Sequence, residues 1–222
     1  MTNGERPRLV VLDMAGTTVR DDGQVPGAFR EALAAAGVTV SDDAVAGVRG
    51  ASKREAVAAL LPDGPDRVAR AAAVYADFHV RLADRFAAGV SEVPGAAAAI
   101  RALRARGIRV AFGTGFDRDI ATMLLAALGW TDLADAVVCG DEVGAGRPAP
   151  DLIRRAMALT GMADPSAVAA AGDTVLDLRA GAAAGVGWNI GVLSGAHDRA
   201  TLAREPHTHL VASVADLPAL WP

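Results

Sequence analysis

Short apolar runs recur along the chain and alternate with longer stretches of helical periodicity. Such a run, rich in Val, Ile, Leu and Ala, is typical of a strand that is buried on both faces. We predict six strands, at residues 8–12, 108–112, 136–138, 167–171, 187–192 and, at an edge of the sheet, 209–212. We predict helices between them at residues 95–106, 118–128, 150–159 and 176–184. Strands that alternate with helices predict an α/β fold with a doubly wound parallel sheet.

One stretch, from about residue 20 to residue 94, departs from this alternation. It has helical patterns and no convincing strand. Ser52 and Glu55 have the S-x-x-E spacing of a capping box at the start of one of its helices. The helices are predicted at residues 26–36, 52–61 and 66–87. The sequence therefore predicts a Rossmann-like core, residues 1–20 and 94–222, with an all-helical unit, residues 21–93, inserted after the first strand.

Composition and charge narrow the class of protein. Of the 222 residues, 52% are hydrophobic and 22% are charged, which allows a substantial buried core. The net charge of −4 is spread without long runs of one sign, so we expect neither nucleic-acid binding nor an anionic membrane surface. No apolar run approaches the ~20 residues that cross a bilayer, and charged residues precede the first strand. We expect a cytoplasmic protein that acts on a small molecule, and a homodimer is left open.

Two residue counts add to this picture. Cys139 is the only cysteine, so an internal disulfide is excluded, and we expect a small buried residue at a strand end. Of the 22 basic residues only Lys53 is a lysine. The single lysine has two possible explanations. One is a composition bias towards Arg that left one Lys by chance, and the other is a functional need for an amine at this position.

Polar residues follow the predicted strands of the core. Asp13 follows the first strand, Thr114 and Gly115 follow the second, and Asp173 follows a later one. A Gly- and Pro-rich loop before Asp173 carries Arg147. Because ligands of open parallel sheets bind beyond the carboxyl ends of the strands, we expect these side chains to meet at one edge.

This set of side chains suits phosphoryl chemistry. A carboxylate such as Asp13 can attack phosphorus and form an aspartyl-phosphate. Mg²⁺ favours carboxylate and carbonyl oxygens, so Asp13, the carbonyl of Ala15 and Asp173 are its expected ligands. Arg147 would neutralise the transferring group and Thr114 would bind its oxygens. Taken singly, each residue has an ordinary role in a turn or a helix cap.

In this order the motifs resemble the haloacid dehalogenase superfamily over nearly the whole chain, the inserted helical cap included. The resemblance implies a Mg²⁺-dependent hydrolase with Asp13 as its nucleophile. It implies that Thr114 belongs to the second motif of the superfamily and that Arg147 is the basic residue of the third. Asp173 and Asp177 would form the G-D-x-x-x-D acidic motif. Asp177 would then support the metal through its water shell. Further residues expected to bind substrate are Thr17, Arg49, Gly50 and Gly115.

Two departures narrow the resemblance to one branch. Phosphatases of the superfamily place a second Asp two residues after the nucleophile, where this chain has Ala15. Losing that general acid slows ester hydrolysis by ~10²–10⁴. The third-motif residue is usually Lys and here is Arg147. Both changes resemble the phosphonoacetaldehyde hydrolase (phosphonatase) branch, with its D-x-A-G-T at residues 13–17 and G-R-P at residues 146–148.

That branch also carries a cap lysine, three residues after a glycine, that forms a Schiff base with the substrate. Gly50 and Lys53 have this spacing. A Schiff base needs an amine that can become neutral, and a guanidinium cannot replace it. We expect Arg49 to lower the pKa of Lys53 through like charge. The alternative is a solvated lysine at the start of a helix.

The match to the branch has two gaps. Arg49 stands where the pattern has Met, and it could bind an additional anionic group of the substrate. Ala56 stands where the pattern has His, and what replaces that His is left open. His79 is a candidate, although a half-buried helix residue is the more common role.

Three functions therefore stay in view. The first is cleavage of the C–P bond of phosphonoacetaldehyde or a related 2-oxo phosphonate, with Lys53 as the Schiff-base residue. The second is hydrolysis of a phosphate monoester such as phosphoglycolate or a sugar phosphate. The third is a non-catalytic binding protein on the same fold, against which the intact set Asp13, Thr114, Arg147 and Asp173 argues.

Overall fold

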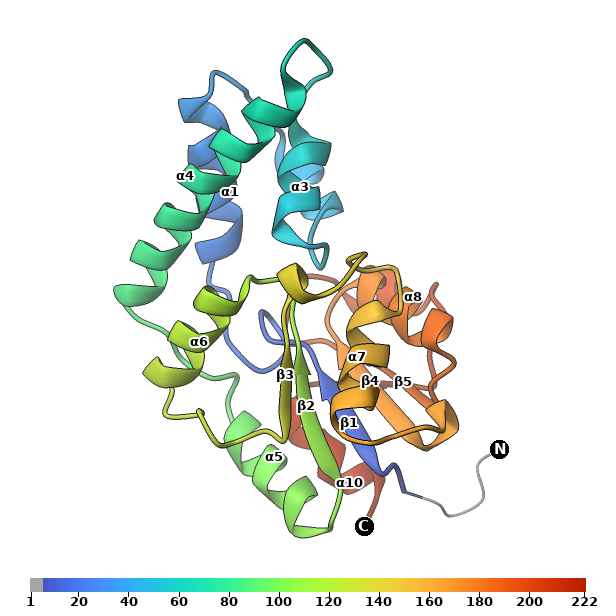
Figure 1. The fold of residues 1–222 in the computed structure, drawn as a ribbon. Helices are drawn as coiled ribbons and strands as arrows, with labels where there is room; N and C mark the ends of the chain where they lie inside the picture. The colour runs from blue at the N-terminus through green and yellow to red at the C-terminus, as the bar shows by residue number, and fades with distance from the viewer. Residues whose placement is uncertain (1–5) are drawn as a thin grey trace.

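A computed structural model describes residues 6–222 (Figure 1). Its centre is a six-stranded parallel sheet in the order β3-β2-β1-β4-β5-β6. The strands are β1 (Leu9–Leu12), β2 (Arg109–Gly113), β3 (Ala136–Val138), β4 (Val168–Gly172), β5 (Trp188–Val192) and β6 (His209–Val211). All six agree with the predicted strands to within one residue, so the predicted α/β fold class is confirmed. β1 pairs with both β2 and β4, which places Asp13 at the middle of the carboxyl edge.

The two faces of the sheet bury different apolar clusters. In β1, Val10 and Leu12 belong to one cluster, whereas Leu9 and Val11 belong to the other, as the alternation of strand side chains requires. The first face is covered by α5 (Ala96–Ala105), α6 (Arg118–Ala127) and α10 (Leu217–Leu220), and the second by α7 (Asp151–Leu159) and α8 (Val175–Ala184). The sheet is therefore wound on both faces.

Shorter elements complete the core. A four-residue helix, α9 (Arg199–Leu202), precedes β6, and 3₁₀ turns lie at Gly140–Glu142, Pro165–Ala167 and Val214–Asp216. Cys139 directly follows β3 and is fully buried, as expected for a small apolar residue at a strand end.

Five helices lie between β1 and β2, and the first four of them stand together beyond the carboxyl edge of the sheet (Figure 1). These four are α1 (Gln24–Ala35), α2 (Asp42–Gly47), α3 (Lys53–Leu60) and α4 (Arg67–Ala87). We call them, with their connecting loops, the cap. Three were predicted; α2 was missed because its six residues are too few for a periodic pattern, although Ser41 caps it by accepting from Ala44 N.

Aromatic contacts hold the cap together and join it to the core. Phe29 of α1 stacks on Phe78 of α4 with ring centroids 4.2 Å apart. At the end of α4, the ring of Phe86 makes a T-shaped contact with the ring of Phe116, which follows β2. The ring centroids are 5.8 Å apart. The apolar interior of the cap is thus continuous with the first face of the sheet.

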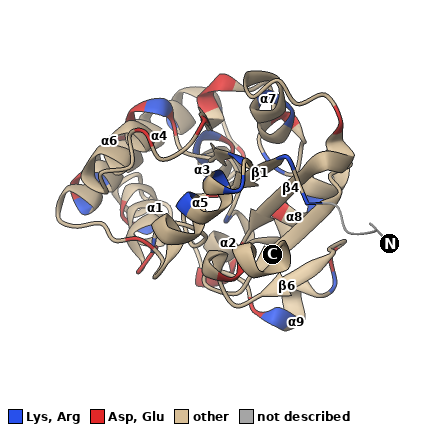
Figure 2. Ribbon diagram, turned by 90° about the horizontal axis from the view of Figure 1, so that it is seen from below, with Lys and Arg blue, Asp and Glu red and all other residues tan. Residues whose placement is uncertain are grey.

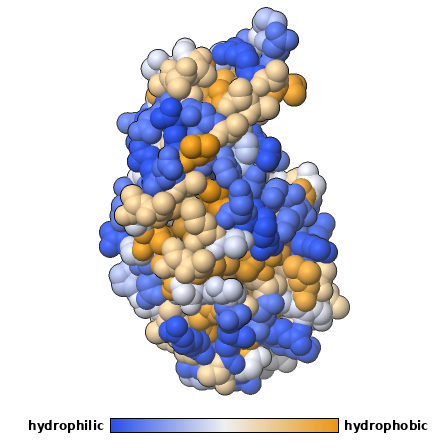
Figure 3. Space-filling model, turned by 60° about the vertical axis from the view of Figure 1, so that its left-hand side comes forward, coloured by the Kyte–Doolittle hydropathy of each residue, from blue (hydrophilic) through white to orange (hydrophobic). Residues whose placement is uncertain are grey.

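Basic and acidic residues are interspersed along the ribbon in the view of Figure 2. On the face shown in Figure 3, apolar areas are broken by hydrophilic side chains. The large hydrophobic residues exposed among residues 6–222 are Val68, Val80 and Leu159. None of the described helices combines the length and the apolar character needed to cross a membrane.

Candidate active site

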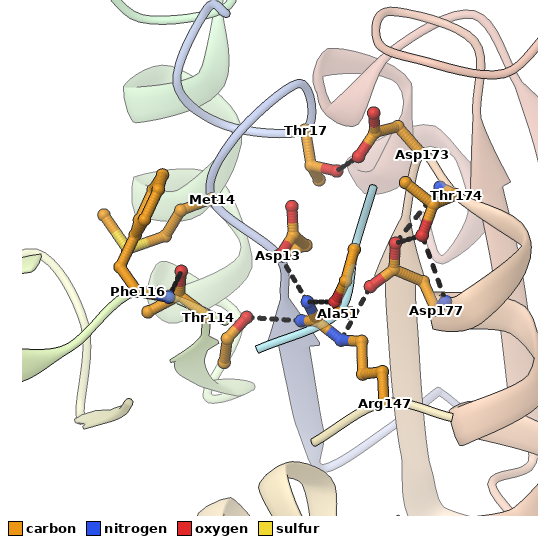
Figure 4. A network of polar contacts seen from close by, with 12 residues as sticks. Asp13, Met14, Thr17, Ala51, Thr114, Phe116, Arg147, Asp173, Thr174 and Asp177 are labelled. Carbon is orange, nitrogen blue, oxygen red and sulfur yellow. Dashed lines mark hydrogen bonds and ion pairs between the residues drawn. The ribbon is translucent and has the colours of Figure 1, made fainter. Parts of the chain in front are cut away.

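Three carboxylates meet at the carboxyl edge of the sheet (Figure 4). Asp13 follows β1, Asp173 follows β4, and Asp177 lies in the first turn of α8. Each offers an oxygen within 4.8 Å of the others, and all three are buried. They converge because β1 and β4 are adjacent parallel strands that end at the same edge.

Arg147 links two of these carboxylates. Its Nη1 lies 2.8 Å from Asp13 Oδ1 and its Nε lies 2.8 Å from Asp177 Oδ1. Its Nη2 donates to the carbonyl of Gly113 at 2.6 Å. A planar guanidinium with five N–H donors can make these bonds together, whereas an ammonium is a point charge with three donors. Arg147 therefore joins Asp13, Asp177 and strand β2.

Both oxygens of Asp173 and the second oxygen of Asp177 have neutral partners. The Thr17 hydroxyl donates to Asp173 Oδ1 at 3.1 Å, and the amide of Ala196 donates to Asp173 Oδ2 at 2.6 Å. Asp177 Oδ2 accepts from the amide of Thr174 at 3.1 Å and from its hydroxyl at 2.5 Å. Thr17, which we expected to bind substrate, is fully buried behind Asp173, so it orients that carboxylate and does not line the site cavity.

The carboxylate cluster carries more negative charge than its surroundings balance. Burial raises the pKa of Asp13 to about 6, against the opposing charge of Arg147. Burial, followed by the charges of Asp13 and Asp177, raises the pKa of Asp173 to about 7. Three buried carboxylates beside one guanidinium are a donor set that fits a divalent cation with a preference for oxygen.

The cap closes a small cavity over this cluster. Its volume is about 20 Å³, which is room for a water molecule. An organic phosphonate or phosphate therefore enters only when the cap or its side chains move. Nine of the eleven site residues that we predicted line the cavity: Asp13, Ala15, Arg49, Gly50, Lys53, Thr114, Gly115, Arg147 and Asp173. The other two, Thr17 and Asp177, lie behind it.

Lys53 is the first residue of α3 and its side chain is buried in the cavity wall. Its Nζ lies 5.2 Å from the ring centroid of Phe116 and donates to the carbonyl of Ala51 at 3.3 Å. Burial lowers the pKa of the amine below its ordinary 10.5, with Asp13 opposing and Arg147 adding to the shift. The expected effect of Arg49 is present but is smaller than both.

Arg49 forms a pair that the sequence did not reveal, and the charge of its partner, Asp21, raises the pKa of Lys53 by more than Arg49 lowers it. Arg49 Nη2 lies 2.7 Å from Asp21 Oδ2, and the Asp21 side chain is buried, with its Oδ1 accepting from the amide of Val25 at 3.1 Å. Arg49 is thus neutralised within the protein. A further anionic group on a substrate would have to compete with Asp21 for the guanidinium.

Other features of the cavity were also missed or placed differently. Phe116 and Thr174 line it, and each lies within two residues of a motif residue, which is the signal that could have found them. His79 does not line it, because its Nε2 lies 2.9 Å from Asp119 Oδ2 on α6. Ala56 is buried, and no described histidine lines the cavity in place of the missing His.

Comparison with known proteins agrees with this geometry. The chain belongs to the haloacid dehalogenase-like hydrolase family, whose model matches residues 7–185. Within the family it is similar to the phosphonoacetaldehyde hydrolases. It is 34% identical over 207 residues to that of Syntrophobacter fumaroxidans, covering 86% of this chain and 74% of the relative. It is 31% identical over 203 residues to that of Paraburkholderia xenovorans, covering 83% and 74%.

Solved structures share the fold. A phosphonoacetaldehyde hydrolase-like protein from Oleispira antarctica superposes with a TM-score of 0.85 at 20% identity, covering 98% of this chain and 92% of that one. A protein described as a phosphoglycolate phosphatase from Lactobacillus plantarum superposes with a TM-score of 0.82 at 17% identity, covering 97% and 100%. At these identities the likeness establishes the architecture and not the substrate.

Proposed function

We propose that this hydrolase cleaves the C–P bond of phosphonoacetaldehyde or a related 2-oxo phosphonate. The observation that carries the proposal is the burial of Lys53, the chain's only lysine, in the same closed cavity as Asp13, with its pKa lowered. A desolvated amine that loses its proton readily is the form that condenses with a carbonyl group. The similarity to curated phosphonoacetaldehyde hydrolases supports the same substrate class.

Mg²⁺ is the proposed cofactor. Asp13, the Ala15 carbonyl and Asp173 would hold the ion, and Asp177 would support it through bound water. The excess of buried carboxylates over cations is the observation that favours this assignment. When bound, the ion would supply positive charge that stabilises the negative charge on the phosphoryl group.

The first half of the proposed reaction separates carbon from phosphorus. The neutral amine of Lys53 attacks the carbonyl carbon, and uptake of a proton from solvent with loss of water leaves an iminium. A carboxylate oxygen of Asp13 attacks phosphorus, and the electron pair of the C–P bond moves to carbon and forms an enamine. Because no alkoxide leaves, no general acid is needed where this chain has Ala15.

The second half restores the enzyme. Water attacks the aspartyl-phosphate, releasing phosphate and the free Asp13 carboxylate. The enamine takes a proton from water to become an iminium, whose hydrolysis releases the carbonyl product and Lys53. Throughout, Arg147 holds Asp13 in place through its 2.8 Å contact, and Thr114 would bind phosphoryl oxygens.

The second candidate is a phosphate monoesterase for phosphoglycolate or a sugar phosphate. Arg49 in the cavity wall and the absence of the cap histidine at Ala56 favour it. The lack of a general acid at Ala15 weighs against it. Membership of a hydrolase family argues against the non-catalytic alternative. The cytoplasmic location, the homodimer and the domain limits at residues 21–93 stay predictions from the sequence.

The deciding experiment measures phosphate release from phosphonoacetaldehyde, phosphoglycolate and 4-nitrophenyl phosphate side by side with Mg²⁺. We expect the phosphonate to be turned over with the highest kcat/KM. Lys53→Arg should abolish turnover of the phosphonate and spare any residual ester hydrolysis. Full phosphonate activity in Lys53→Arg would exclude the Schiff-base mechanism, and a preference for an ester would favour the second candidate.

A further inference from the structure

The loop of the cap that leads into α3 packs against the core at two glycines, Gly115 and Gly146, which have no side chain. A Cβ on Gly115 would lie 2.5 Å from the carbonyl oxygen of Ala51, and a Cβ on Gly146 would lie 2.9 Å from Ser52 Cβ and 3.1 Å from Ser52 N. Neither glycine has a positive φ. Space for the cap, and not backbone conformation, therefore explains glycine at these two positions of the core.

A third glycine makes the reciprocal contact from the cap. Gly50 has a φ of +88°, which favours glycine, and a Cβ there would collide with the hydroxyl of Thr174. Thr174 is held by its bonds to Asp177, so it cannot move aside freely. The start of α3 is thus fitted closely to the core on three sides.

Polar contacts fix the same turn of α3 to two different core loops. The backbone amide of Lys53 donates to the carbonyl of Gly115 at 3.2 Å. Glu55 Oε1 accepts from the amide of Gly146 at 3.2 Å. The predicted capping box is therefore only half formed: Ser52 accepts from the Glu55 amide at 3.3 Å, but the Glu55 side chain turns to the core instead of back to Ser52.

Arg54 makes the second side-chain contact with the core. Its Nη2 lies 2.9 Å from Asp117 Oδ2, and its guanidinium lies 4.2 Å from the ring centroid of Tyr75. Tyr75 Oη donates to the same Asp117 oxygen at 2.5 Å. Asp117 stands at the N-cap of α6 but does not cap that helix. Its buried carboxylate is instead committed to the cap.

We propose that Arg54 and Glu55 are positioning residues that hold the amine of Lys53 in the cavity with Asp13 when the cap is closed. The proposal rests on the proposed Schiff-base role of Lys53. Among the described residues, Lys53 Nζ has one hydrogen bond, to Ala51, which belongs to the cap itself. The place of the amine relative to Asp13 therefore depends on where the first turn of α3 is fixed.

The test compares Glu55→Ala with Glu55→Gln, whose amide oxygen can still accept from Gly146. We expect Glu55→Ala to lower kcat for phosphonoacetaldehyde about tenfold with a small change in KM, and Glu55→Gln to restore most of it. Turnover of 4-nitrophenyl phosphate, which does not need Lys53, should change little. Equal loss on both substrates, or no rescue by Gln, would overturn the positioning role.

Arg54→Ala tests the contact with Asp117 in the same assays, and we expect it too to lower kcat for the phosphonate selectively. Arg30→Ala is the matched control, because Arg30 also pairs with an aspartate, Asp42, but on the exposed surface of the cap. Wild-type turnover in Arg54→Ala would overturn the role of Arg54.

Hydrogen exchange separates this proposal from the proposed function. In Glu55→Ala the amide of Gly146 should exchange faster, whatever the substrate is. Unchanged exchange there would overturn the contact even if the wild type cleaves phosphonates. A wild type that neither cleaves phosphonates nor is labelled at Lys53 by an aldehyde and borohydride would instead remove the proposed function.

Discussion

Arg147 Nη1 lies 2.8 Å from Asp13 Oδ1, and both side chains are less than one-tenth exposed. The pair places a permanent positive charge beside the candidate nucleophile. Because the same guanidinium reaches Asp177, its loss would leave two buried carboxylates without their cation. The contact therefore affects stability as well as chemistry.

Replacing the guanidinium tests this relationship. Arg147→Met should lower the free energy of unfolding by about 3–5 kcal/mol, the range for breaking a buried ion pair. Arg179→Met is the control, because Arg179 pairs with Glu205 from a half-exposed position and should cost about 1 kcal/mol or less. Urea unfolding at pH 8 in EDTA measures both, and equal losses would contradict the buried network.

The raised pKa values of Asp13 and Asp173 predict how stability depends on pH. Between about pH 4 and pH 7 these two carboxyl groups bind more protons in the folded protein than in the unfolded chain, where their pKa lies near 3.8. Stability of the metal-free protein should therefore fall as the pH rises through this range. Mg²⁺ should then raise the Tm more at pH 8 than at pH 5.

Thermal unfolding with EDTA or Mg²⁺ at the two pH values measures this effect. Asp173→Asn removes one carboxylate and should reduce the difference between the two pH values. An equal rise in Tm at pH 5 and pH 8 in the wild type would show that the metal binds elsewhere.

The lowered pKa of Lys53 predicts the pH at which its amine reacts. The neutral form becomes more abundant as the pH rises, and burial brings this rise below the ordinary pKa of 10.5. Labelling by acetaldehyde and borohydride, read as intact mass from pH 6 to pH 10, should increase with a midpoint below that value. Because the chain has one lysine, Lys53→Arg leaves only the terminal amine to be labelled. A midpoint at or above 10.5 would contradict the buried amine.

The Asp21–Arg49 pair predicts a change in substrate preference. Asp21→Asn should release the guanidinium of Arg49 and lower KM several-fold for substrates that carry an additional carboxylate, such as phosphoglycolate. Asp22→Asn is the matched control, because Asp22 pairs with Arg20 at the exposed surface. Identical KM values in the two variants would show that Arg49 does not face the substrate's substituent.

The sequence by itself determined the sheet and the set of residues at its carboxyl edge. Buried runs such as Leu9–Leu12 are local patterns, and a strand end fixes where the next residue, Asp13, must lie. Parallel pairing then brings Asp13 and Asp173 together without further information. The cap was recognisable for the same reason, except for α2, whose few residues form no period.

The tertiary structure alone decided where the polar side chains point. Thr17 donates to Asp173, and Arg49 pairs with Asp21. Glu55 does not complete its expected capping box and instead accepts from the amide of Gly146, 91 residues away. A buried charge or amide is stabilised by whichever partner the fold brings within reach. Local sequence specifies the donor or acceptor, but only the tertiary packing specifies its partner.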